Sequence, residues 1–184
     1  MNKTYSVAVL VGSLRKASIN RKLALALSEL AQPSLQLKII EIGELPLYNE
    51  DIDQDNPPAA YSDFRSQLQA ADALLFVTPE YNRSVPAPMK NAIDVGSRPY
   101  GKSAFSGKPG AVLSASPGAI GGFAANHHLR QSMVFLDVHM MQQPEAYLGG
   151  AGSFFDEAGK LDDGIKPFLQ KFIDAYAAWV ARHL

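Results

Sequence analysis

The chain alternates between short, nearly continuous apolar runs and longer stretches in which apolar residues recur every three or four positions. The first run, Tyr5–Val11, is apolar at almost every position instead of at every second one. This pattern is typical of a strand buried on both faces of a parallel sheet. Comparable runs predict further strands at 35–41, 73–77, 110–114 and 138–142.

Stretches rich in leucine and alanine predict helices between and after these strands. Prolines mark several boundaries. Pro33 ends the first helix, whereas Pro57 and Pro58 begin the second, with Asn56 as its expected N-cap. The predicted helices span 19–31, 57–71, 86–96, 120 or 122 to 135, and 165–182.

The regular alternation of strands and helices predicts an α/β fold, in which a doubly wound parallel sheet lies between two helix layers. Five strands favour the spatial order 2-1-3-4-5. The chain has 184 residues and no internal repeat, so we assign residues 1–184 to a single domain. The stretches 43–58 and 97–109 are predicted to be long loops, which in compact domains are often functional.

Composition narrows the chemistry. The chain contains no cysteine, which excludes disulfides, thiolate nucleophiles and cysteine-ligated metals. Lys and Arg number 17 against 18 Asp and Glu, and this balance argues against nucleic acid or a membrane surface as partner. The longest apolar run, Ala175–Ala181, is far shorter than the roughly twenty residues that span a bilayer. We expect a cytoplasmic protein whose chemistry comes from a bound cofactor.

The loops at the carboxyl ends of the strands carry the candidate chemistry, because ligands of such sheets bind there. In the loop after the first strand, Gly12 allows a turn, Ser13, Ser18 and Asn20 offer small polar donors, and Arg15 offers a charged fork. The helix that follows presents free N–H groups, so the loop predicts a phosphate site. The alternative is a solvated turn with Ser18 as a plain N-cap. The loop lacks the G-x-G-x-x-G pattern and the Lys-Ser/Thr ending of a P-loop.

The loop after the third strand, 78–86, is stiffened by Pro79 and Pro86, and Tyr81 adds a planar face. Such a loop suits the polar edge of a flat ring, although a proline-bounded connector has the same composition. Glu80 resembles a general base, but no second carboxylate accompanies it.

The loop after the fourth strand, 114–122, contains three glycines, which permit close backbone approach to a ligand. A flexible turn is the alternative. Three such loops at one edge of the sheet favour a ligand site more strongly than any one of them.

Several blocks of this sequence are similar to the NADPH-dependent FMN reductase family, and within it to bacterial quinone reductases, some of which also reduce chromate. They are Gly-Ser-Leu-Arg-Lys-x-Ser-x-Asn at 12–20, Pro-Glu-Tyr-Asn-x-Ser-x-Pro-x-x-x-Lys-Asn-Ala-Ile-Asp at 79–94, and Ser-Pro-Gly-x-x-Gly-Gly at 116–122. A fourth block lies between 129 and 145. The resemblance covers most of the chain in the right order, and the second block is the most specific.

The resemblance implies a flavodoxin-like fold, one FMN per protomer, and NADPH or NADH as electron donor. It implies cofactor-binding residues in three groups. The phosphate group comprises Ser13, Arg15, Ser18 and Asn20. The ring segment comprises Pro79, Glu80, Tyr81, Asn82 and Arg83, and the opposite loop comprises Ser116 and Gly118. The family usually forms homodimers or homotetramers with FMN near a subunit interface. Ala87, Val95 and His127 depart from the usual pattern near the expected subunit contacts.

The implied reaction is a ping-pong, two-electron reduction of a quinone-like acceptor, in which donor and acceptor use the same face of the flavin in turn. Chromate, free flavin and azo compounds are further candidate acceptors. No side chain is assigned as a catalytic acid or base, and no histidine spacing indicates a metal site. One alternative is a flavodoxin-type electron carrier, although such carriers are usually strongly acidic. The other is a serine hydrolase using Ser116 with His127 or His128, although the G-x-S-x-G pattern is missing.

Overall fold

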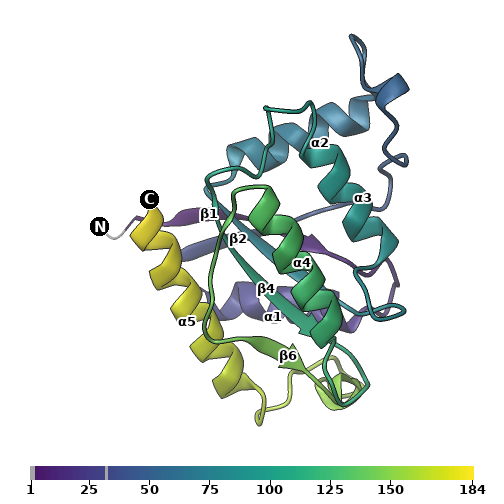
Figure 1. Cartoon of the computed structure of the whole chain (residues 1–184). Coiled ribbons are helices and arrows are strands. Elements are labelled where there is room, and N and C mark those ends of the chain that lie inside the picture. The colour runs from purple at the N-terminus through teal and green to yellow at the C-terminus, as the bar shows by residue number, and fades with distance from the viewer. Residues whose placement is uncertain (1–2, 32) are drawn as a thin grey trace.

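A parallel β-sheet forms the centre of the molecule in the computed structural model, which describes residues 3–31 and 33–184 (Figure 1). The strands are β1 (Tyr5–Val11), β2 (Leu35–Ile40), β3 (Ala73–Thr78), β4 (Pro109–Ala115), β5 (His139–Met140) and β6 (Ala146–Leu148). The helices are α1 (Ile19–Leu30), α2 (Ala59–Ala70), α3 (Ala87–Gly96), α4 (Phe123–Phe135) and α5 (Lys166–His183). Two short 3₁₀ turns span Glu50–Ile52 and Ala151–Ser153.

The sheet has the order β2-β1-β3-β4-β5, and the registered strand pairs are parallel. Helices α1 and α5 pack on one face, against alternate residues such as Val7 and Val9. Helices α2, α3 and α4 pack on the other, against residues such as Ala8 and Leu10. Because both faces are covered, β1 and β3 are apolar at nearly every position, as the sequence predicted. The predicted flavodoxin-like order and the three layers are confirmed.

The predicted fifth strand at 138–142 is the main difference. Two short strands, β5 and β6, both pair with β4, and Pro144 lies between them. Proline has no N–H to donate to a ladder, so the strand stops before it and resumes at Ala146. The expected N-cap of the second helix was also wrong, because Pro58 and not Asn56 precedes the first turn of α2.

The strand register brings the carboxyl ends of β1, β3 and β4 to the same level. Val11 lies beside Val77, and Thr78 lies beside Ser114. Gly12 then turns the chain so closely past β3 that an added Cβ would lie 2.8 Å from Oγ1 of Thr78. The loops after these strands therefore leave the sheet together, on the right-hand side of Figure 1.

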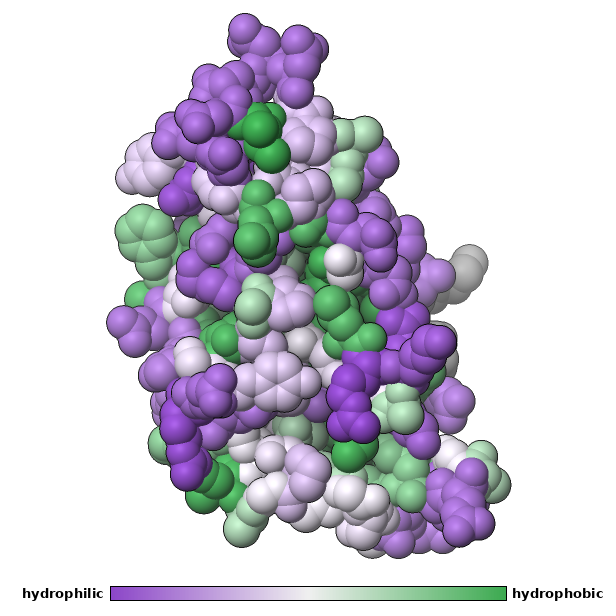
Figure 2. All heavy atoms as spheres, turned by 90° about the vertical axis from the view of Figure 1, so that its right-hand side faces the viewer, coloured by the Kyte–Doolittle hydropathy of each residue, from purple (hydrophilic) through white to green (hydrophobic). Residues whose placement is uncertain are grey.

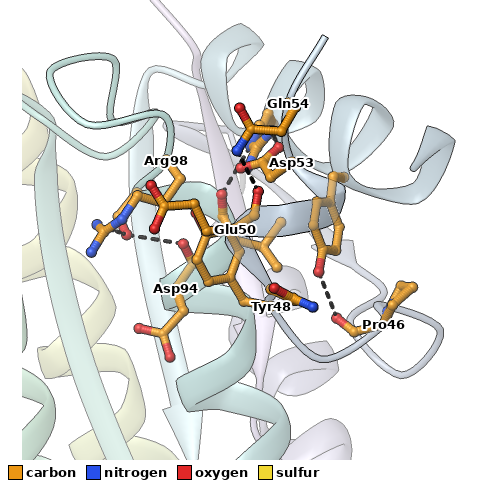
Figure 3. Close-up of polar contacts among 12 residues, drawn as sticks. Pro46, Tyr48, Glu50, Asp53, Gln54, Asp94 and Arg98 are labelled. Atoms are coloured by element: carbon orange, nitrogen blue, oxygen red, sulfur yellow. Dashed lines mark hydrogen bonds and ion pairs between the residues drawn. The ribbon is translucent and has the colours of Figure 1, made fainter. Parts of the chain in front are cut away.

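The long segment 43–58 after β2 is fastened to α2 and α3 by polar contacts (Figure 3). Arg65 on α2 forms a two-pronged ion pair with Asp53, with N–O distances of 2.7 and 2.6 Å. The backbone N–H of Tyr48 donates to Asn91 of α3 at 2.8 Å. The hydroxyl of Tyr61 donates to Leu47 O at 2.9 Å. The segment 43–58, predicted to be a long loop, is therefore held in place beside the strand ends that carry the candidate site.

Candidate functional site at the carboxyl edge of the sheet

The loop between β1 and α1 presents donors suited to an anion. None of the backbone N–H groups of residues 13–17 donates to another group within the described ranges 3–31 and 33–184. Ser18 caps α1 by accepting the Arg21 N–H at 3.1 Å, which leaves its own O–H free to donate. Arg15 is exposed on the rim. The predicted N-cap role of Ser18 is confirmed, and it is compatible with a phosphate at the same helix start.

Asn20 supplies the sharpest sign that this loop holds a ligand. Its side chain is buried, and Nδ2 donates to Ala115 O at the end of β4 over 3.3 Å. Within the described part of the chain, Oδ1 has no hydrogen-bond partner. A buried unpaired acceptor costs about 1–3 kcal/mol, so a ligand group that donates a hydrogen bond is expected there.

The loop after β3 folds into a miniature hairpin. Tyr81 and Ser84 exchange two backbone hydrogen bonds, at 3.1 and 3.0 Å. Between them, Asn82 and Arg83 both have left-handed backbones, with φ of 51° and 62°. Two such residues define a type I′ turn, which aligns with the twist of its flanking strands. This hairpin leaves Tyr81 about half exposed.

Glu80 anchors this hairpin to α4. Its Oε2 accepts the backbone N–H of Ala125 at 3.0 Å, in the first turn of the helix. The N-cap of α4 is Gly122, which has no side chain to accept a backbone N–H of the first turn. Glu80, from a different loop, accepts one instead. Its carboxylate therefore links the loop after β3 to the start of α4.

The loop after β4 is built on glycines packed against β6. Ser116 pairs with Leu148 O through its N–H at 3.0 Å, and its Oγ accepts the Gly118 N–H at 3.2 Å. At Gly121, where φ is 61°, an added Cβ would lie 2.5 Å from the Tyr147 carbonyl carbon. Gly121 is thus required for close packing of backbone on backbone, whereas Gly118 has room for a side chain, and the flexible-turn alternative does not hold at Gly121.

Beside this loop lies an aromatic cluster that the sequence reasoning missed. Phe123 is half exposed, with its ring centroid 4.3 Å from that of His127 and 5.1 Å from that of Tyr147. The Tyr147 hydroxyl lies 2.9 Å from His127 Nε2. Burial, and next the neighbouring carboxylate of Glu145, raises the pKa of Tyr147 to about 12, so the phenol stays neutral at physiological pH. The sequence signal that could have revealed this cluster was the apolar–aromatic–apolar alternation of Ala146–Leu148, which is typical of a strand.

The hydrolase alternative finds no support in these contacts. His127 contacts Tyr147, and His128 Nδ1 lies 3.0 Å from Ser84 Oγ, so within the described residues neither histidine is paired with Ser116.

Arg130, also on α4, is held by two hydrogen bonds. It donates to Asn126 Oδ1 at 2.9 Å and to Met141 O at 2.8 Å.

Figure 2 looks onto the side of the molecule where these loops lie, and apolar and polar patches adjoin there. A cleft of about 250 Å³ lies between Ser13, Arg15 and the segment after β2. Two larger clefts, of about 510 and 540 Å³, lie between α1 and residues 155–166 and between α3 and α4. The mixed surface at the strand ends suits a ligand with a flat ring and an anionic tail.

The strand order, with donor-rich loops beyond β1, β3 and β4, defines a flavodoxin-like nucleotide-binding protein. Residues 5–153 match the model of the family described as NADPH-dependent FMN reductase. A quinone reductase from Pseudomonas putida is 67% identical over 180 residues, which cover 98% of this chain and 97% of that protein. A 2-hydroxy-1,4-benzoquinone reductase from a Burkholderia species is 47% identical over 175 residues, which cover 95% of each.

Among solved structures, FerB from Paracoccus denitrificans, a flavoenzyme NAD(P)H:(acceptor) oxidoreductase, superposes with a TM-score of 0.91 and 41% identity. The match covers 97% of this chain and 98% of that one. The chain belongs to the NADPH-dependent FMN reductase family, and it is an oxidoreductase. The site fits FMN, because the loop at 13–20 provides unpaired N–H donors for a phosphate and Asn20 Oδ1 provides a buried acceptor for a hydroxyl.

Proposed function

We propose that this protein is an FMN-dependent NAD(P)H:quinone oxidoreductase that works by a ping-pong, two-electron cycle. The observation that carries the proposal is the convergence of the three loops at one edge, with the unpaired Oδ1 of Asn20 between the first loop and β4. The names of the similar proteins, a quinone reductase and a benzoquinone reductase, support the acceptor class.

The proposed roles of the chain's own residues are binding and orientation. Ser13, Arg15, Ser18 and Asn20 hold the phosphate and the chain attached to it. The hairpin 79–83 holds the polar edge of the ring, where the N–H groups of Asn82 and Arg83 donate to nothing else in the described residues. Ser116 and Gly118 line the other side. When bound, FMN supplies the acceptance and donation of hydride, and fixed N–H donors at the ring edge favour added negative charge.

Flat acceptors other than quinones fit the same proposal. No side chain in this scheme must donate a proton to a particular acceptor atom. Free flavin and azo compounds share that planar shape. Chromate does not, so it would accept electrons without stacking.

The purified protein gives the first test. A flavin absorption spectrum with about one FMN per chain is expected, and anaerobic mixing with NADPH or NADH should bleach it. A quinone should then restore the colour, and steady-state velocities should give parallel double-reciprocal lines. A protein that keeps FMN oxidised in the presence of both nucleotides would contradict the proposal and favour a carrier that needs a partner reductase.

The proposal includes a homodimer, or a homotetramer built from dimers, formed through the α3–α4 face. Val134 and Phe135 leave 75% and 73% of their surface exposed there, beside a cleft of about 540 Å³. Apolar exposure of this kind is typical of an interface. Light scattering should report a dimer or tetramer, and Phe135→Asp should reduce it to a monomer. A monomeric wild type at micromolar concentration would exclude this assembly.

A cytoplasmic location is also part of the proposal, since reduced pyridine nucleotides are supplied there. In the described part of the chain, every helix is too short or too polar to cross a bilayer.

A further inference from the structure

Arg83 stands at the tip of the I′ hairpin, where a side chain is least constrained by neighbours. Its φ of 62° is a backbone conformation that glycine or asparagine adopts more readily than arginine. The turn therefore needs no arginine for its own formation. Its side chain is 72% exposed.

The contact that Arg83 makes is weak. Its Nη1 lies 3.4 Å from Oε1 of Glu80, which is long for a charge-assisted hydrogen bond. The other oxygen of Glu80 accepts the Ala125 N–H, which ties the carboxylate to α4 and not to Arg83. Arg83 thus keeps most of its donors available to a ligand.

Two other arginines, Arg21 and Arg130, are each held by two hydrogen bonds. Arg21 forms two bonds to Glu41, at 3.1 and 2.6 Å, and Arg130 is held by a side chain and a carbonyl. Arg15, on the loop after β1, has no hydrogen-bond partner in the described ranges, and the proposed FMN phosphate occupies it. Arg83 is then an available guanidinium on the loop after β3.

We propose that Arg83 binds a phosphate group of the pyridine nucleotide, an inference that rests on the proposed function. NADH and NADPH both carry a pyrophosphate, and NADPH carries a further 2′-phosphate. The hairpin 79–83 is proposed to hold the edge of the flavin ring, so a nucleotide stacked on that ring would bring its phosphates beside the same hairpin. A planar guanidinium can hold two phosphate oxygens at once, which a lysine cannot.

The test compares Arg83→Gly and Arg83→Lys with wild type, all as FMN-loaded protein. Glycine suits the left-handed turn, so the hairpin is kept while the fork is lost. Titration calorimetry with NADP⁺ and with NAD⁺ measures binding without turnover. We expect Arg83→Gly to raise the Kd about tenfold to a hundredfold and to flatten its dependence on salt, with Arg83→Lys in between. The control is Arg182→Ala, which removes one arginine charge elsewhere in the molecule, in the last turn of α5.

Stopped-flow separates this role from a structural one. The NADPH concentration that half-saturates flavin reduction should rise in Arg83→Gly by a larger factor than the limiting rate of reduction falls. A loss of affinity confined to NADP⁺ would show that Arg83 binds the 2′-phosphate. An equal loss of affinity for both nucleotides would show that it binds the pyrophosphate. Unchanged Kd values for both overturn the assignment. If the wild type binds nucleotide without being reduced, the proposed function fails while the binding comparison still decides the role of Arg83.

Discussion

The buried ion pair between Asp53 and Arg65 provides a quantitative test of how the segment 43–58 is held beside the site. The two side chains are 2% and 11% exposed, and Arg65 also donates from Nε to Val95 O. Replacing Asp53 by alanine leaves the guanidinium buried without its counter-charge. Because water cannot compensate for that loss, we expect a large destabilisation.

The magnitude follows from burial. Breaking a buried pair by removing one partner costs about 3–5 kcal/mol. For a chain of this length, each kcal/mol lowers Tm by about 2–4 °C, so Asp53→Ala should melt about 6–20 °C below wild type. Thermal unfolding followed by circular dichroism at saturating FMN measures this, since free cofactor would otherwise shift Tm by mass action.

The chain contains its own control. Arg21 and Glu41 form a pair with the same two-pronged geometry and the same 2.6 Å closest distance, but the side chains are 41% and 66% exposed. Glu41→Ala should therefore cost less than about 1 kcal/mol. The double variant Asp53→Leu/Arg65→Met should recover most of the lost stability, because no unpaired charge remains. Equal shifts for Asp53→Ala and Glu41→Ala would refute the reasoning from burial.

Three further predictions concern other parts of the molecule. Asn20→Ala should raise the Kd for FMN at least about tenfold, measured by fluorescence quenching on apoprotein; an unchanged Kd would remove the ligand role of its unpaired Oδ1. Gly96→Ala should destabilise by about 1–3 kcal/mol in urea, because the new Cβ would lie 2.6 Å from the Phe105 ring; a gain in stability, usual for this change in an open helix, would contradict the packing. The wild-type minus Tyr147→Phe difference in phenolate absorbance should titrate near pH 12, and an inflection at pH 10 would argue against burial of that hydroxyl. Since the folded pKa is raised, this tyrosine's contribution to stability is present below about pH 10 and is lost as pH rises toward 12.

The site illustrates why particular contacts escape prediction. Glu80 is separated from Ala125 by 45 positions, so nothing local indicates that its carboxylate completes the first turn of α4. Tyr147 lies on β6, which pairs with β4 only because the chain resumes its strand after Pro144. Both depend on the meeting of distant segments, which composition and periodicity do not encode.

Local patterns in the chain were enough to predict the alternation of strands and helices, the strand order and the three loops that carry polar residues. These follow from local patterns, because a strand covered on both faces must be apolar throughout and a turn must contain residues that permit it. The family blocks at 12–20, 79–94 and 116–122 added FMN to that framework.

Which of the polar side chains keep an unpaired donor or acceptor became visible in the folded molecule alone. Ser18 and Glu80 are engaged at helix starts, Asp53 is committed to Arg65, and Asn20 keeps one unpaired oxygen. The availability of a donor or acceptor depends on every group within about 3 Å of it, and most of those groups come from other segments of the chain.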